Sequence, residues 1–318
     1  MTGQITQVEQ QERVLVTGGC GFIGRAVVAA FRARGLAVTV ADREQAVKPL
    51  DGVRYIHGDL TDADVRDAAL AEGTTGIVHL AALTSVLKSV DRPAQTYTDN
   101  VAVTQELLEL GRQRGATKFL FASTNAVVGD VGSSTITDDL PPRPLTPYGA
   151  TKAACEMLLS GYAGAYGMAT CALRFTNVYG PGMAHKDSFV PRMMRAALTG
   201  SGVTVYGDGR QQRDLVHIDD VVRAILLAWD SGHTGRAIVG SGRSVSVLEM
   251  IEAVRTATGR PVPAEHVTAP GGEMPAVIVD VSRSAETIGY RPSVGLIDGL
   301  ASTWQYFLES AQAEGEQA

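Results

Sequence analysis

The chain has 318 residues, which is enough for one large domain or two modest domains with a substantial core. Hydrophobic residues make up 45% of it and charged residues 19%, a composition typical of a globular protein and not of a disordered one. The formal net charge of −6 argues against a nucleic-acid partner, because such a partner selects a basic face. No run of residues is long and apolar enough to predict a membrane-spanning helix.

The three cysteines indicate a reducing compartment. Cys20, Cys155 and Cys171 lack the spacing of a disulfide framework or a metal site, so we expect a cytoplasmic protein without a metal. Residues 1–11 are polar and have no apolar signal-peptide core. We expect them and 312–318 to be flexible tails.

The first predicted element is a strand at 13–17, followed at once by three glycines and a helix at 25–34. A strand that turns sharply into a helix leaves free N–H groups at the helix start, and these bind phosphate oxygens. Gly18 permits the turn, Gly21 lets a pyrophosphate approach the backbone, and Gly24 lets the helix pack on the strand. The pattern predicts a dinucleotide-binding loop, with a tight turn that binds nothing as the alternative.

A second apolar strand, at 36–42, ends in Asp42. A carboxylate at this place accepts hydrogen bonds from the diol of an adenosine ribose and repels a 2′-phosphate. Asp42 therefore favours NAD over NADP, although Arg43 beside it could accommodate a phosphate.

The third strand, at 54–56, leads to Asp59 and Leu60 at the edge where the ligands of a parallel sheet gather. Asp59 is either a hydrogen-bond acceptor for an adenine amine or the N-cap of a helix at 63–71. The residues alone do not decide between these two roles.

A fourth strand, at 76–82, is apolar on both faces, as a buried parallel strand is. It ends in Ala81 and Ala82, which are small enough to leave room for a flat or bulky ligand. A long helix is predicted at 98–114, and Asn100 near its start is expected to hold a neighbouring loop.

A fifth strand, at 118–124, ends in Ser123 and Thr124. The order of elements so far predicts an α/β fold with a Rossmann-type doubly wound parallel sheet. The alternation then loosens, which predicts a smaller mixed α/β part towards the C-terminus. Its predicted elements are a strand and turn within 170–182, a helix at 188–198, a strand and turn at 203–209, a strand and helix over 213–229 capped by Asp219 or Asp220, a strand at 236–239, a helix at 247–258 and a strand at 276–280.

A helix that opens at Tyr148 carries Lys152 one turn later, so the two side chains project from one face. A tyrosine with a pKa near ~10 is a poor base at neutral pH, but a nearby ammonium and an oxidised nicotinamide ring lower that pKa. Such a tyrosine takes the proton of a sugar hydroxyl as hydride leaves the same carbon, and Thr124 can hold the oxygen in line. The alternative is a surface aromatic beside a solvated lysine.

Together these motifs resemble the extended short-chain dehydrogenases/reductases, in the nucleotide-sugar epimerase/dehydratase group, nearest to the UDP-glucose 4-epimerase-like proteins. The resemblance runs from about Arg13 to about Tyr290. Its marks are TGGCGFIG, Asp42, GDL at 58–60, HLAA at 79–82, Asn100, FAST at 121–124, YGATK at 148–152, LRFTNVYGPG at 173–182 and YGDGRQQRDLVHIDD at 206–220.

The resemblance implies a catalytic set of Thr124, Tyr148 and Lys152. The residues that it implies for binding NAD are Gly18, Gly21, Phe22, Ile23, Gly24, Asp42, Arg43, Asp59, Leu60, Leu80, Ala81, Ala82, Asn100, Ser123, Tyr148, Lys152, Phe175 and Val178. The residues that it implies for binding the substrate are Ser85, Thr124, Asn125, Asn177, Ser188, Phe189, Val190, Arg192, Tyr206, Arg213 and Glu273.

Family likeness also implies the domains and the assembly. An NAD-binding Rossmann domain is expected at 12–176 plus about 214–240, and a substrate-binding domain at 177–213 plus 241–310. Helices beginning near Val86 and at Tyr148 are expected to pair in a homodimer.

Two departures from the family pattern bear on the reaction. Asn125 and Ala126 stand where the dehydratases of this group carry an Asp–Glu pair, and neither can do acid/base work. Pro270 stands where relatives usually carry an arginine that holds the second phosphate. Either the diphosphate is held more weakly, or another cation replaces that arginine: Arg192, Arg195 or Arg243.

These features predict NAD-dependent epimerisation at C4 of a nucleoside-diphosphate sugar, with UDP favoured, through a transient 4-keto intermediate. One alternative is an NAD(P)-dependent nucleotide-sugar oxidoreductase with net redox. A 4,6-dehydratase is less favoured because of Asn125 and Ala126. A non-catalytic sensor that uses the nucleotide domain to bind a partner is a further alternative, against which Tyr148 and Lys152 count.

Overall fold

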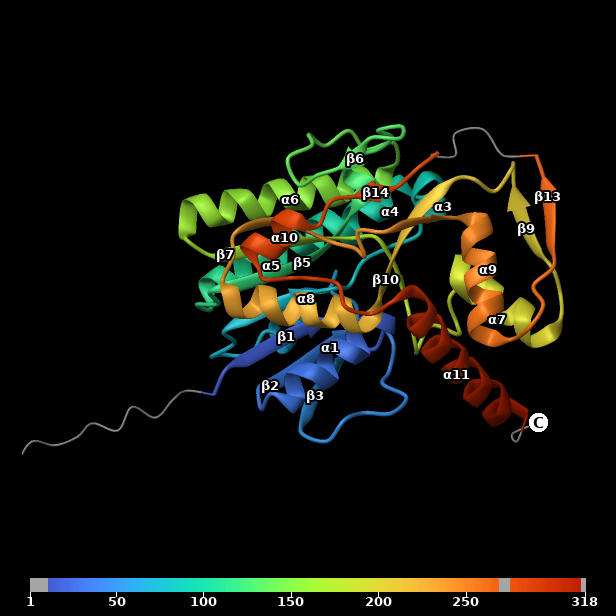
Figure 1. Ribbon diagram of the computed structural model, residues 1–318. Helices are drawn as coiled ribbons and strands as arrows, with labels where there is room; N and C mark the ends of the chain where they lie inside the picture. The colour runs from blue at the N-terminus through green and yellow to red at the C-terminus, as the bar shows by residue number, and fades with distance from the viewer. Residues whose placement is uncertain (1–10, 269–274, 316–318) are drawn as a thin grey trace, which may run out of the picture.

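The structure is a computed structural model that describes residues 11–268 and 275–315. Parallel strands form a seven-stranded main sheet in the order β11-β7-β5-β4-β1-β2-β3 (Figure 1). They are β1 (Arg13–Thr17), β2 (Ala37–Asp42), β3 (Val53–His57), β4 (Gly76–His79), β5 (Lys118–Thr124), β7 (Ala169–Phe175) and β11 (Gly235–Val239). The predicted doubly wound parallel sheet is confirmed.

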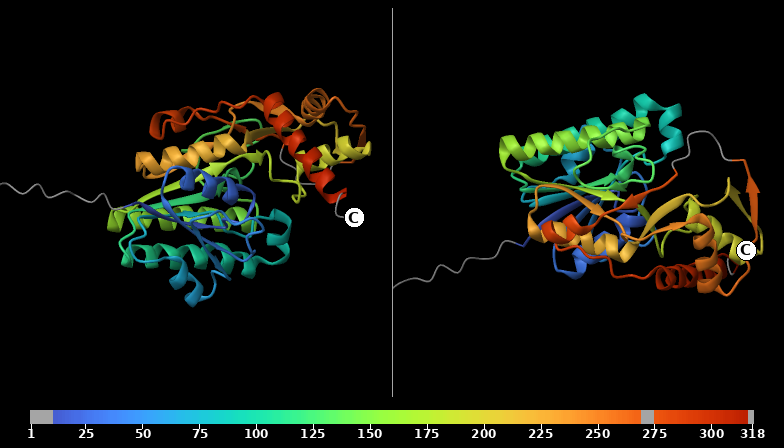
Figure 2. Two further views of the ribbon diagram at one scale, coloured as in Figure 1. Left: turned by 90° about the horizontal axis from the view of Figure 1, so that it is seen from below. Right: turned by 45° about the horizontal axis from the view of Figure 1, so that its top comes forward.

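Helices cover both faces of this sheet (Figure 2). Val14 and Val16 of β1 point into the core on one face and Leu15 into the core on the other, because side chains alternate along a strand. The face of Val14 lies under α1 (Phe22–Ala33) and α8 (Ile218–Ser231). The face of Leu15 lies under α2 (Ala63–Ala69), α5 (Val103–Gln113) and α6 (Pro147–Tyr166), with α3 (Val86–Asp91) and α4 (Pro93–Tyr97) against α6.

A smaller part of the chain builds a second apolar core beyond the carboxyl ends of the main strands. Its helices are α7 (Phe189–Thr199), α9 (Val247–Thr258) and α11 (Leu296–Gly315), which pack around Met194, Met250 and Leu300. Its strands are β8 (Asn177–Tyr179), β10 (Gln212–His217) and β12 (Ser244–Ser246) in one sheet, and β9 (Val203–Tyr206) paired with β13 (Ala264–Val267). Two short strands, β6 (Thr135–Ile136) and β14 (Ile278–Val279), pair beside α10 (Ser282–Thr287) (Figure 1).

The predicted strand within 170–182 is in fact two strands in two sheets. β7 ends at Phe175 in the main sheet, whereas β8 begins at Asn177 and pairs with β10. Thr176 between them therefore marks the point where the chain passes from the large core to the small one.

Two helices differ from the prediction. The helix predicted at 98–114 continues an earlier one: α4 is followed by a π turn, η1 (Thr98–Ala102), and then by α5. That turn buries Asp99 and Asn100, polar residues that in the sequence alone are typical of a helix start. The sequence does not predict α11, which extends to Gly315, so the tail expected at 312–318 begins inside a helix.

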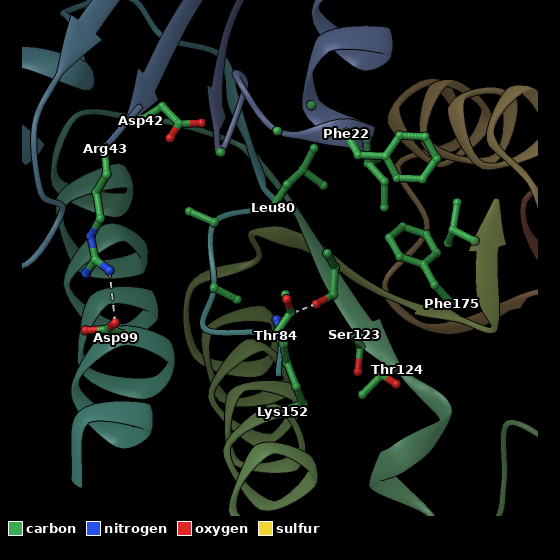
Figure 3. Close-up of a pocket in the computed structure, with 18 of the residues that line it drawn as sticks. Phe22, Asp42, Arg43, Leu80, Thr84, Asp99, Ser123, Thr124, Lys152 and Phe175 are labelled. Atoms are coloured by element: carbon green, nitrogen blue, oxygen red, sulfur yellow. Dashed lines mark hydrogen bonds and ion pairs between the residues drawn. The ribbon is translucent and has the colours of Figure 1, made fainter. Parts of the chain in front are cut away.

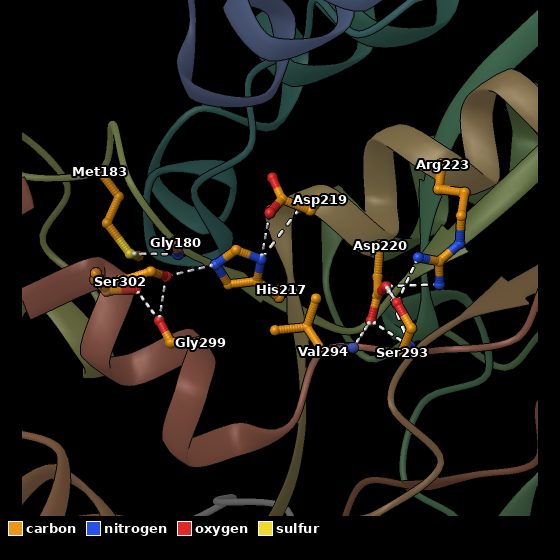
Figure 4. Close-up of polar contacts among 11 residues, drawn as sticks. Gly180, Met183, His217, Asp219, Asp220, Arg223, Ser293, Val294, Gly299 and Ser302 are labelled. Atoms are coloured by element: carbon orange, nitrogen blue, oxygen red, sulfur yellow. Dashed lines mark hydrogen bonds and ion pairs between the residues drawn. The ribbon is translucent and has the colours of Figure 1, made fainter.

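The helix cap expected at Asp219 or Asp220 is His217 instead (Figure 4). His217 Nδ1 accepts the N–H of Asp219 at 3.3 Å, and its Nε2 lies 3.2 Å from Ser302 Oγ on α11. The carboxylate of Asp220 accepts the N–H of Ser293 at 3.0 Å. These contacts fix α8, which covers the main sheet, to the segment that leads into α11. Among the described residues, no helix is both long enough and apolar enough to cross a membrane.

Candidate functional site

The loop between β1 and α1 requires glycine at two places. Gly18 has φ +69°, and a Cβ there would lie 2.8 Å from the backbone nitrogen of Ala81. A Cβ on Gly24 would lie 2.0 Å from the carbonyl oxygen of Gly18, so α1 packs directly on the turn. Gly21 is the N-cap of α1 and places no side chain over the N–H groups of the first turn. This close-fitting cradle suits a diphosphate that must approach the backbone.

A cavity of about 390 Å³ opens at the carboxyl ends of the main strands, in front of this loop (Figure 3). Most residues predicted to bind the cofactor line it: Gly18, Gly21, Phe22, Ile23, Gly24, Asp42, Arg43, Leu60, Leu80, Ala81, Ala82, Ser123, Tyr148, Lys152, Phe175 and Val178. The structure therefore gathers residues from distant parts of the chain around one cavity.

Asp42 lies at the end of β2, at the rim of this cavity. Its carboxylate accepts the N–H of Cys20 at 2.8 Å and the N–H of Glu44 at 2.9 Å. These two bonds fix the orientation of the carboxylate, which is what a group that recognises a ribose diol needs.

Two residues predicted to touch the cofactor do not line the cavity. Asp59 makes an ion pair with Arg43 at 2.9 Å and accepts the N–H of Thr61, and the cap of α2 is Asp62, so the N-cap role for Asp59 is wrong. Asn100 is buried beneath the cavity wall. Its side chain accepts the N–H of Leu83 at 2.8 Å, which confirms that it holds a neighbouring loop.

The three residues predicted to be catalytic, Thr124, Tyr148 and Lys152, also line this cavity, at the carboxyl end of β5. Burial raises the pKa of Tyr148 to about 12, and a hydrogen bond with Thr124 lowers it in part. Lys152 is almost fully buried, and burial lowers its pKa to about 8. Its ammonium donates to the carbonyl oxygen of Ala122 at 2.7 Å. The predicted lowering of this pKa by Lys152 and an oxidised nicotinamide concerns the cofactor-bound protein and stays a prediction; in the chain without cofactor, burial of the phenol dominates.

A buried ion network lies directly behind this end. Glu156, one turn after Lys152 on α6, accepts a 2.6 Å hydrogen bond from Ser123 Oγ. Its carboxylate also pairs with Arg174 at 2.7 Å and with Arg236 at 3.1 Å. Ser123 is therefore anchored from behind while it lines the cavity.

A second cavity, of about 560 Å³, lies between β8, α7 and β9. Five residues predicted to bind the substrate line it: Asn177, Phe189, Arg192, Tyr206 and Arg213. Arg195, one of the cations considered as a replacement at Pro270, lines it too. A cavity with arginines and an exposed tyrosine can take a nucleoside diphosphate, because guanidinium groups match phosphate oxygens and a ring can stack on a base.

Four residues predicted to bind substrate line neither cavity. Ser85 caps α3 by accepting the N–H of Lys88, and Val190 is buried in the second core. Ser188 stands at the exposed start of α7. Asn125 is 7% exposed, and its amide has no hydrogen-bond partner among the described residues. Pro270 and Glu273 lie outside the described residues.

Several cavity residues were not predicted. The first cavity is also lined by Thr84, Asp99, Thr176 and Lys186. Asp99 could have been predicted to pair with a cation, because it stands beside Asn100 in a helix with apolar neighbours, where a buried acid needs a partner. Nothing in the sequence predicts that Thr176 and Lys186 line the cavity, because only the passage of the chain between the two cores brings them there.

The family model for the NAD-dependent epimerases/dehydratases matches residues 14–240. The chain belongs to the NAD-dependent epimerase/dehydratase family. UDP-glucose 4-epimerase of Corynebacterium glutamicum is 32% identical over 300 residues, 88% of this chain and 91% of that protein. A dTDP-glucose 4,6-dehydratase of Actinoplanes sp. is 31% identical over 315 residues, 93% of this chain and 97% of that protein.

A solved structure adds the cofactor. UDP-glucose 4-epimerase of Thermus thermophilus in complex with NAD is similar to this structure with a TM-score of 0.85, at 35% identity, over 93% of this chain and 99% of that chain. The cofactor of this epimerase/dehydratase-family chain is NAD. The glycine cradle and the cavity before it fit that dinucleotide.

Proposed function

We propose that the protein epimerises a nucleoside-diphosphate sugar, preferably a UDP-sugar, at C4. The observation that carries this proposal is that Thr124, Tyr148 and Lys152 lie at one end of the cofactor cavity. The second cavity, with Arg192 and Arg213, supplies a place for the diphosphate part of such a substrate. The names of the epimerase relatives support the same reaction.

NAD, when bound, supplies the hydride acceptor and, once reduced, the hydride donor. The residues of the chain move and hold protons around it. Tyr148 accepts the proton of the C4 hydroxyl and later returns it to the same oxygen. Thr124 binds that oxygen, and the ammonium of Lys152 favours the ionised phenol that takes the proton. We propose this division of roles for the three residues.

The dehydratase relatives define the second candidate. Removal of water needs an acid and a base beside the active-site threonine, and this chain has Asn125 and Ala126 there. Asn125 is held in the short 3-10 turn η2 (Asn125–Val127), where its amide is buried. An amide can donate and accept hydrogen bonds but cannot relay a proton at neutral pH, so we favour epimerisation.

One experiment separates the candidates. UDP-glucose and dTDP-glucose with deuterium at C4 are offered separately to the enzyme with NAD, and the products are followed by proton NMR and by absorbance of the reduced nicotinamide. We expect the C4 epimer with deuterium retained at C4 and no accumulation of reduced cofactor. A 4-keto product that has lost water would indicate a dehydratase, and stoichiometric reduced cofactor would indicate an oxidoreductase. Either result would refute the proposed reaction.

A further inference from the structure

Arg43 lines one end of the cofactor cavity and is held by two carboxylates, Asp59 and Asp99, of which Figure 3 shows Asp99. Its Nε lies 2.9 Å from one oxygen of Asp59, and its Nη2 donates to the other oxygen at 3.0 Å. Its Nη1 donates to Asp99 at 3.1 Å. Every nitrogen of the guanidinium therefore has a carboxylate partner, and the forked contact with Asp59 is the strong, directional kind.

The two carboxylates reach Arg43 from different elements. Asp59 follows β3, and Asp99 lies in the π turn before α5, 56 positions after Arg43. The side chain of Asp99 is only 4% exposed, and its other oxygen accepts a 2.5 Å hydrogen bond from Gln95. A buried carboxylate with a fixed second partner resists rearrangement, so it holds the guanidinium in place.

The charge around this end of the cavity is negative. Asp42, Glu44 and Asp99 line it together with Arg43, and Asp59 stands directly behind. An arginine next to the carboxylate at the end of the second strand is well placed to receive a ribose 2′-phosphate, provided its donors are free. Here three of its five N–H donors point at carboxylates, and a doubly charged phosphate would enter a group of four carboxylates around one cation.

We propose that Asp59 and Asp99 determine the preference of this protein for NAD over NADP by holding the Arg43 guanidinium away from a 2′-phosphate. Asp42 recognises the ribose diol, and the carboxylate pair removes the cation that would otherwise accept NADP. This inference rests on the family cofactor and not on the sugar reaction, so each can fail without the other.

Equilibrium binding of NAD and NADP to nucleotide-free protein tests the proposal. The variants are Asp59→Asn, Asp99→Asn, the double variant, and the double variant with Arg43→Ala. Asn keeps the shape of Asp and removes its charge. Asp230→Asn is the matched control, because it frees Arg34 from a 2.9 Å surface ion pair that lines no part of the cavity.

We expect the double variant to bind NADP at least about 10-fold more tightly than the parent, as a new charge-assisted contact to phosphate allows, whereas NAD gains no such affinity. Adding Arg43→Ala should abolish the gain, and Asp230→Asn should leave both affinities as in the parent. An unchanged NADP affinity in the double variant, or equal weakening for both dinucleotides, would overturn the proposal. Circular dichroism of each variant confirms that it is folded.

Discussion

The ammonium of Lys152 donates a 2.7 Å hydrogen bond to the carbonyl oxygen of Ala122, and this bond ties α6 to the carboxyl end of β5. The next two residues on that strand are Ser123 and Thr124, both of which line the cofactor cavity. One buried lysine therefore fixes the strand end that carries Thr124 and supplies positive charge to the same space.

The charge on Lys152 should make both stability and activity of the parent depend on pH, and Lys152→Met removes this charge while it keeps an unbranched apolar side chain. Burial lowers the pKa of Lys152 to about 8, so the ammonium is lost above that pH in the folded chain, whereas an unfolded chain stays protonated to higher pH. The free energy of unfolding should therefore rise between about pH 8 and 10.5, by about 3 kcal/mol, and activity should fall over the same range.

The Lys152→Met variant should lose at least about 100-fold in kcat and show no such rise in stability at alkaline pH. Urea unfolding and kcat measured from pH 7 to 10 check both effects. Lys48→Met, at an exposed lysine of the loop after β2, is the control and should behave as the parent. A parent whose activity stays constant to pH 10 would show that the charge on Lys152 is not needed.

Tyr148→Phe removes the phenol that we assign to proton transfer. We expect kcat to fall by about 10²- to 10⁴-fold because no other group takes its place at the sugar oxygen. Bound NAD, measured after denaturation by its absorbance, should remain at parental occupancy. Tyr166→Phe is the matched control on the same helix, since Tyr166 is 56% exposed. A parental kcat in Tyr148→Phe would show that this phenol does not carry the proton transfer.

Glu156→Gln breaks a buried network of one acid and two arginines. The side chains of Glu156 and Arg174 are 1% and 0% exposed, so the change leaves buried positive charge without its partner. We expect a loss of about 3–5 kcal/mol in the free energy of unfolding, measured in urea. Glu252→Gln breaks an exposed pair with Arg255 and should cost less than about 1 kcal/mol. Equal losses in the free energy of unfolding for the two variants would mean that burial does not increase the contribution of the Glu156 network to stability.

Asp138 is a buried acid whose ionised form destabilises the fold. It is 5% exposed, neither carboxylate oxygen has a hydrogen-bond partner of normal geometry among the described residues, and burial raises its pKa to about 6. The folded chain therefore holds a proton that the unfolded chain has already released, and stability falls as the pH rises from about 4 to 6.

Asp138→Asn should remove that fall and raise the free energy of unfolding at pH 7 by about 1–2 kcal/mol. Thermal and urea unfolding at pH 4.5 and pH 7 check this. The neighbouring Asp139 is exposed and paired with Arg283, and Asp139→Asn should show no comparable gain. A less stable Asp138→Asn variant would show that the ionised carboxylate stabilises the nearby Arg174.

An exposed apolar face on α3 favours a homodimer. Val86, Leu87 and Val90 are 43%, 80% and 58% exposed, and α3 packs against α6, on which Met157 is 49% exposed. Exposed apolar patches of this kind mark interaction sites. Light scattering should give twice the 33.5 kDa chain mass for the parent and one chain mass for Leu87→Asp. Val47→Asp, at an exposed valine of the loop after β2, should remain dimeric. A monomeric parent would refute the dimer.

Local rules of the backbone made much of this structure predictable. The turn at Gly18 needs a positive φ and Gly24 tolerates no Cβ, so glycine spacing located the cofactor loop. The one-turn spacing of Tyr148 and Lys152 placed both on one face of α6, and both line the cavity. These inferences depend on neighbours in the chain, and neighbours in the chain can be read from the sequence.

Tertiary structure alone decided which distant groups pair. Arg43 meets Asp99, Glu156 meets Arg174 and Arg236, and Asn100 holds Leu83 because the packed sheet brings separate segments together. The pKa of Tyr148 likewise follows from burial, which no spacing rule reports. The sequence by itself determined the sheet, the glycine loop and the tyrosine–lysine pair. Packing decided the partners and the pKa values, because charge interactions depend on distance and dielectric in three dimensions.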